Sequence, residues 1–281
     1  MSIAVLIGVH DGLVLAADSA STLTISVAPG AVTGVANVYD NANKIFNLYK
    51  GKPIGCVIFG AGSIGNSSIG TLIKDLRAAL MDKEKGKKLG IEFDPNNYTM
   101  EQVSKIVTKF LADECQKQKP ASLLGMSIGL LLGGYSTNGS LGESWSVEIQ
   151  PGGKATEPKQ MRQPDQPGIS WGGAAEVLQR IILGFSPTLF PVLAEVSGAK
   201  GQPPVSAQQM FEQLNPLLIA KLQAPLVFAP MPIQDAIDLG RFLVHAATMY
   251  SRFLPGAQIV GGCCGTSPEH LAEISRNVKQ Q

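Results

Sequence analysis

The sequence predicts an α+β protein, because segments with strand character and segments with helical character come in separate runs. Apolar runs bounded by turn residues fill residues 3–59, and apolar residues at helical spacing follow over residues 63–81 and 100–115. Strands therefore do not alternate strictly with helices. The same order is repeated downstream, with strand segments at residues 123–135, 145–149 and 169–172, and helical segments at residues 174–184, 207–222 and 233–250.

An N-terminal hairpin is the first predicted element. Residues 3–9 and 13–17 are apolar, and Asp11 and Gly12 lie between them, which is a strong signal for a tight turn between two strands. Asp18 then ends the second strand. A second hairpin is predicted at residues 44–49 and 54–59, with its turn at residues 50–52.

Three segments lack a clear strand or helix pattern. Residues 22–42 mix Thr, Val, Gly and Asn without helical period, which is typical of a long loop or of short strands. Residues 83–88 are mostly Lys and are expected to form a solvated helix end. Residues 187–204 are rich in Pro and Gly, so they are expected to be an irregular insertion.

The composition argues against several classes of protein. Charged residues are 16% of the 281 and the formal net charge is +1, so nothing indicates nucleic-acid binding. The N-terminus lacks the charged start and cleavage site of a secretory signal, and the uncharged residues 121–142 are rich in Gly and Ser, which favours buried strands over a membrane span. Four cysteines are too few for a disulfide framework here. We therefore expect a cytoplasmic protein without nucleic-acid or membrane partners.

Ser2 becomes the N-terminal residue when Met1 is removed, which a small second residue allows. Its hydroxyl would then be a nucleophile and its own α-amine a general base, because both groups lie on one residue. An α-amine has an unperturbed pKa of about 8, so it can accept a proton near neutrality. Taken singly, a serine at position 2 is common without any such role, Asp18 is typical of a turn that ends a strand, and Lys44 is typical of an exposed strand.

Three short blocks follow Ser2 in a fixed order. They are DGLVLAADS at residues 11–19, KIF at residues 44–46 and GAG at residues 60–62. With these blocks the chain resembles the proteasome β-subunit group of N-terminal-nucleophile hydrolases. Residues 132–135, 144–147 and 151–153 are similar to the central hairpin of that group, so the resemblance covers roughly residues 2–262.

The resemblance implies a four-layer αββα sandwich and a hydrolase of the threonine-type endopeptidase kind, which cleaves peptide or other amide bonds through Ser2. The positive charge of Lys44 would favour the deprotonated hydroxyl and amine of Ser2, and Asp18 would hold Lys44 charged and oriented. The backbone N–H of Gly60, or that of Gly62, would face the developing oxyanion, where glycine allows close approach of the substrate.

The same resemblance implies peptide or protein substrates, a homo-oligomeric ring and an unfoldase as a partner, without a cofactor. A catalytically inactive structural subunit with the same fold is the alternative, and a retained Met1 would favour it.

The C-terminal segment has a different character. Residues 256–271 contain GGCCG followed by a capped helix start, Ser-Pro-Glu. This segment looks like the zinc-thiolate segment of homocysteine S-methyltransferases, which implies zinc on Cys263 and Cys264 with a third ligand. That ligand would be Cys56, Cys115 or His270. We therefore divide the chain into a proteasome-like domain at residues 2–262 and an atypical C-terminal helix or tail at residues 263–281, with a zinc-thiolate methyltransferase as a further alternative function.

Overall fold

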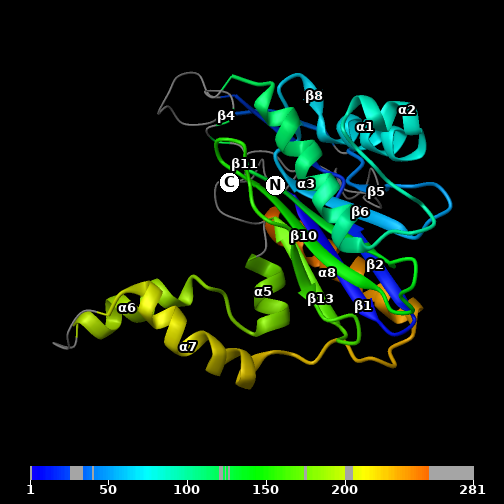
Figure 1. Cartoon of the computed structure of the whole chain (residues 1–281). Coiled ribbons are helices and arrows are strands. Elements are labelled where there is room, and N and C mark those ends of the chain that lie inside the picture. Colours follow the sequence, from blue (N-terminus) through cyan, green and yellow to red (C-terminus); the bar gives the residue numbers. More distant parts are fainter. Residues whose placement is uncertain are drawn as a thin grey trace, which may run out of the picture.

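Two β-sheets lie face to face at the centre of the molecule, and helices cover the outer face of each (Figure 1). A computed structural model provides this view of the chain. It describes residues 2–25, 34–39, 41–119, 123, 125, 127–173, 176–199 and 205–252.

The smaller sheet has the strand order β13-β1-β2, and both of its pairings are antiparallel. Its central strand is buried on both faces. In β1 the side chains of Ile3, Val5 and Ile7 face the outer helices, and those of Ala4 and Leu6 face the larger sheet, as the two-residue period of a strand requires. The strands are β1 (Ile3–Val9), β2 (Gly12–Ala17) and β13 (Gly168–Gly173).

The larger sheet has the order β11-β10-β9-β6-β5, and β12 also pairs with β10. Val57 and Leu131 point from this sheet toward the smaller sheet, whereas Ile58 and Leu130 point toward the helices on its other side. The side chains between the two sheets therefore form one thin apolar layer. The strands are β5 (Ile45–Asn47), β6 (Ile54–Gly60), β9 (Ile128–Gly134), β10 (Glu143–Gln150), β11 (Lys154–Ala155) and β12 (Lys159–Arg162).

Helices α1 (Ile69–Met81) and α3 (Met100–Gln116) cover the larger sheet, and the short α2 (Lys83–Lys88) follows α1. Ser68 caps α1 by accepting a hydrogen bond from the Thr71 N–H. Thr99 and Gln102 form a reciprocal capping box at the start of α3. Capping satisfies N–H groups that have no partner within a helix, so these local signals fix where the two helices begin.

Helices α5 (Glu176–Leu183) and α8 (Ile233–Arg252) pack against the smaller sheet. Helices α6 (Leu189–Ala199) and α7 (Ala207–Leu222) project away from the sheets (Figure 1). The rings of Phe190 and Phe211 join these two helices, with 5.2 Å between their centroids and an edge-to-face orientation. In the described parts of the chain, no helix combines the length and apolar character needed to cross a bilayer.

The structure confirms both predicted hairpins and corrects three other expectations. Residues 187–204 contain a helix, α6, where an irregular insertion is expected; Pro191 lies in its first turn, where a missing N–H costs no hydrogen bond. The helix expected from residue 63 begins at Ile69, because β7 (Ser63–Ile64) and β8 (Ser67–Ser68) precede it. Residues 83–88 are a separate helix, α2, because the Asp82 side chain accepts hydrogen bonds from the N–H groups of Glu84 and Lys85.

For residues 22–42 the sequence is compatible with a long loop or with short strands. The structure places two short strands there, β3 (Ser21–Ile25) and β4 (Gly34–Tyr39), which pair with each other in antiparallel fashion. Short strands, and not a single long loop, therefore form in the described part of residues 22–42.

Candidate functional site

Lys44 lies at the centre of a polar cluster that joins the two sheets. Its Nζ donates a hydrogen bond to Asp18 Oδ1 at 2.8 Å and another to Ser2 Oγ at 3.2 Å. The side chains of Lys44 and Asp18 are only 6% and 3% exposed, and Ser2 is half-buried. The structure thus brings together three of the residues singled out from the sequence.

The local fold explains why these three residues meet. Ser2 immediately precedes β1 and Asp18 immediately follows β2, and the antiparallel pairing of these strands puts both residues at the same end of the sheet. Lys44 immediately precedes β5 of the larger sheet, where its carbonyl accepts a hydrogen bond from the Ile58 N–H at 2.9 Å. The cluster forms where these ends of the two sheets meet.

The Asp18 carboxylate is held by three hydrogen bonds. Its Oδ1 accepts from the Ile3 N–H at 2.6 Å as well as from Lys44, and its Oδ2 accepts from the Ala20 N–H at 3.1 Å. A buried carboxylate needs such partners, because an unpaired charge in the protein interior is very unfavourable. Asp18 therefore fixes Lys44 and at the same time binds the peptide bond that follows Ser2.

This arrangement determines what each group can do chemically. An ammonium ion paired with a carboxylate is a hydrogen-bond donor, so Lys44 can stabilise negative charge on Ser2 Oγ but is poorly suited to remove its proton. A base for Ser2 must then come from another group. The α-amine that Met1 removal would release on Ser2 itself is such a group.

Gly60 ends β6, two residues beyond Ile58, and no hydrogen bond joins it to Ser2, Asp18 or Lys44 among the described residues. It has a φ of +88°, and a Cβ there would lie 2.3 Å from the Ser127 carbonyl oxygen, so only glycine fits. The next N–H, that of Ala61, is already bound to the same oxygen at 2.7 Å. Gly60 and Gly62 both remain candidates for the oxyanion donor.

Gly173 is a residue of the site that the sequence does not reveal. It has a φ of +87°, and a Cβ built on it would lie 1.9 Å from the Ser2 carbonyl oxygen. The adjacent Gly172 is packed against the ring of Phe59, the residue before Gly60. The ends of β13 and β6 therefore meet beside Ser2. The available signal was the Gly-Gly pair between a strand and a helix, which predicts a close backbone approach without identifying its partner.

The predicted zinc ligands are not brought together in the described residues. Cys263, Cys264 and His270 lie outside them, and no group of three or more His, Cys, Asp or Glu side chains with metal-site geometry occurs within them. Cys56 and Cys115 are fully buried in the apolar core. Burial raises the pKa of the Cys56 thiol to about 12, whereas zinc binds the thiolate. Neither buried cysteine fits the role of third ligand.

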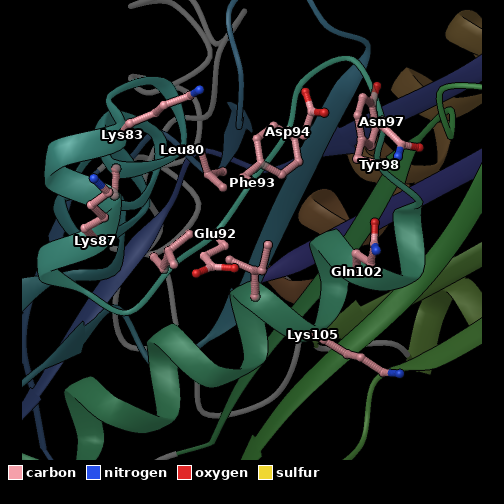
Figure 2. Close-up of a pocket in the computed structure, with 13 residues that line it drawn as sticks. Leu80, Lys83, Lys87, Glu92, Phe93, Asp94, Asn97, Tyr98, Gln102 and Lys105 are labelled. Atoms are coloured by element: carbon pink, nitrogen blue, oxygen red, sulfur yellow. The ribbon is translucent and has the colours of Figure 1, made fainter.

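A cavity of about 670 Å³ lies on the helical side of the larger sheet, between α2 and α3 (Figure 2). Figure 2 shows Lys83 and Lys87 on one side of it, Lys105 on the other, and Phe93 and Tyr98 on the loop between the helices. The lysines are offset by acidic residues that also line the cavity, and none of the residues of the Ser2 cluster lines it. The cavity is therefore separate from that cluster. The acidic lining residues are Glu92 and Asp94.

Comparison with known proteins gives a partial match to a family. Residues 207–278, about a quarter of the chain, match the homocysteine S-methyltransferase family. The search of curated proteins finds no match. Within residues 207–252 the structure has two helices, α7 and α8, and α8 packs on the antiparallel β1 and β2. The match thus agrees with the resemblance of the GGCCG segment, all of which lies beyond the described residues.

Proposed function

We propose that this chain is a proteasome-like N-terminal-nucleophile hydrolase that cleaves peptide or other amide bonds through Ser2 after removal of Met1. The observation that supports the proposal most directly is the position of Lys44 Nζ, 3.2 Å from Ser2 Oγ and 2.8 Å from Asp18 Oδ1. A buried lysine that is held by a carboxylate and directed at a hydroxyl suits the activation of that hydroxyl.

In the proposed reaction, Ser2 Oγ attacks the substrate carbonyl carbon, and the Ser2 α-amine accepts the hydroxyl proton. Lys44 stabilises the charge that develops on Oγ, and the N–H of Gly60 or Gly62 donates to the oxyanion. The amine then returns the proton to the leaving nitrogen as the C–N bond breaks, which leaves an ester on Ser2. Water, activated by the same amine, hydrolyses the ester and releases the acid.

The arrangement of sheets and helices supports the fold part of the proposal. Two facing sheets with helices on both outer faces are what an αββα sandwich requires. We accordingly propose residues 2–262 as the hydrolase domain, peptides or proteins as substrates, a cytoplasmic location, and assembly into a ring that works with an unfoldase.

The test is the intact mass of the purified protein before and after incubation with a β-lactone, which acylates N-terminal hydroxyl nucleophiles. The expected result is loss of the Met1 mass and one adduct that maps to Ser2. Ser2→Ala serves as the matched control, because it removes the nucleophilic hydroxyl, together with the hydrogen bond from Lys44, and keeps the N-terminal amine. Retained Met1 without an adduct would instead favour the inactive structural subunit.

A zinc-thiolate methyltransferase is a second candidate, which the match at residues 207–278 favours. Its test is the zinc content of the purified chain, measured for the wild type and for Cys263→Ser/Cys264→Ser. One zinc per chain that is lost in the double variant would support it. A metal-free wild type would eliminate it.

A further inference from the structure

Gly173 lies where β13 meets the residue that bears the proposed nucleophile. Ile3 and Gly173 are partners in the β1–β13 pairing. A Cβ built on Gly173 would lie 1.9 Å from the Ser2 carbonyl oxygen and 2.8 Å from the Ser2 carbonyl carbon. These distances are far below van der Waals contact, so the Ser2 carbonyl occupies the space that any side chain at position 173 would need.

The two ends of the Ser2 peptide bond are thus held by different elements. Gly173 of β13 packs against its carbonyl oxygen, and Asp18 Oδ1 accepts a hydrogen bond from its N–H, on Ile3, at 2.6 Å. Asp18 Oδ1 also accepts a hydrogen bond from Lys44. The same carboxylate therefore holds both the backbone of Ser2 and the lysine that faces the Ser2 hydroxyl. The position of Ser2 Oγ follows from the position of this peptide bond.

We infer that Gly173 is a positioning residue for Ser2, and this inference rests on the proposed hydrolase function. By leaving room for the Ser2 carbonyl, Gly173 lets Ser2 Oγ reach Lys44 Nζ at 3.2 Å. A side chain at position 173 would push the carbonyl away and carry the hydroxyl with it. A misplacement of about 1 Å costs on the order of 100-fold in rate.

The test compares Gly173→Ala with Gly152→Ala. Gly152 has a φ of +86°, nearly the same as that of Gly173, but it lies in an exposed turn with no atom within 4 Å of an added Cβ. Both alanines therefore take the same unfavourable positive φ, and only the alanine at position 173 meets Ser2. The reaction followed is acylation of Ser2 by the β-lactone.

We expect Gly173→Ala to lower kinact by about 100-fold and to leave KI within about 3-fold, because the geometry of attack changes while the binding surface does not. Gly152→Ala should match the wild type in both constants. The split between kinact and KI separates positioning from a general loss of structure. A kinact for Gly173→Ala within about 3-fold of the wild type would overturn the inference.

Melting temperatures decide two further cases, namely a Gly173→Ala variant that does not fold and a wild type that gives no adduct. If Gly173→Ala does not fold, adding Ser2→Gly should restore folding, because glycine lets the carbonyl at position 2 turn away; no recovery would overturn the inference. If the wild type gives no adduct, the proposed function fails on its own account. The Gly173 contact is then supported only if Gly173→Ala has a lower melting temperature than Gly152→Ala. Adding Ser2→Gly to Gly173→Ala must also reduce this difference in melting temperature.

Discussion

Lys44 and Asp18 form an ion pair of 2.8 Å whose side chains are 6% and 3% exposed, whereas Lys105 and Glu101 form one of 2.6 Å with both side chains more than half exposed. The two pairs have almost the same geometry and opposite surroundings. Solvent screens the exposed pair, so its net contribution to stability is small. The buried pair cannot exchange its partner for water, which makes each of its members dependent on the other.

Lys44→Met should therefore lower the free energy of unfolding by about 3 kcal/mol, because it leaves the Asp18 carboxylate buried and unpaired. Lys105→Met should leave it nearly unchanged, because solvent screens this exposed pair. Urea denaturation measures both. In the double variant Asp18→Asn/Lys44→Met the buried charge is absent, so much of the lost stability should return. Equal effects of Lys44→Met and Lys105→Met would contradict this account of the cluster.

The Cys56 thiol should make stability depend on alkaline pH. Burial raises its pKa from 9.0 to about 12, so above about pH 9 the unfolded chain releases a proton that the folded chain retains. The contribution is complete at neutral pH and is lost as the pH rises from about 9 to 12, at about 1.4 kcal/mol per pH unit.

The measurement is the free energy of unfolding of the wild type and of Cys56→Ala at about pH 7.5 and about pH 10. Other buried groups with raised pKa values, such as Cys115 and Tyr98, add to both slopes, so only the difference between the two proteins is informative. The wild type should lose stability more steeply than Cys56→Ala. Parallel profiles would show that the Cys56 thiolate is tolerated in the core.

Arg162 should contribute little to stability although its guanidinium is partly buried. Its Nη1 donates to Ser170 Oγ at 2.8 Å, but its buried Nη2 has no partner among the described residues, and desolvation lowers the pKa of the guanidinium. Arg162→Met should leave the free energy of unfolding unchanged or raise it by about 1 kcal/mol, as thermal or urea unfolding would show. Arg180→Met, at an exposed pair with Glu176, is the matched control. A loss of several kcal/mol at position 162 alone would mean that Nη2 has a partner in solution.

The ring of Phe59 separates two glycines from opposite sheets. An added Cβ would lie 2.4 Å from a ring atom at Gly172 and 2.1 Å at Gly129. Gly172→Ala should cost about 1–3 kcal/mol through overpacking, and Phe59→Leu should relieve part of that cost when combined with it. Gly198→Ala, on an open helical site in α6, should be neutral or stabilising. Additive effects of Gly172→Ala and Phe59→Leu in urea denaturation would contradict the contact.

Local signals account for the parts of the fold that the sequence predicts. The hairpin of β1 and β2 follows from Asp11-Gly12 between apolar runs, and α3 follows from its apolar period and capping box. Helix α6 is hidden because its proline, although a helix breaker elsewhere, lies in the first turn. The spacing of apolar residues alone does not show where α1 and α2 begin. These boundaries depend on capping side chains within the segment.

The sequence predicts only those residues of the candidate site that belong to a recognisable motif, because it does not give the distances between residues in space. Asp18 and Lys44 belong to short blocks that follow Ser2 in the sequence, so a family pattern can connect the three residues before their contacts are known. Gly173 belongs to the site through the register of β1 against β13, and composition or local spacing does not encode that register.

The Ile3–Gly173 pairing joins positions separated by more than half of the chain, and the Lys44–Ser2 contact joins residues 42 positions apart. Closing long loops is entropically unfavourable, so contacts of such long range slow the folding of a chain. On the ribosome, the segment that contains Ser2 is made first and must wait for β13 before its surroundings are complete. If the proposed hydrolase function holds, Ser2 would gain its complete surroundings only after most of the chain has been synthesised.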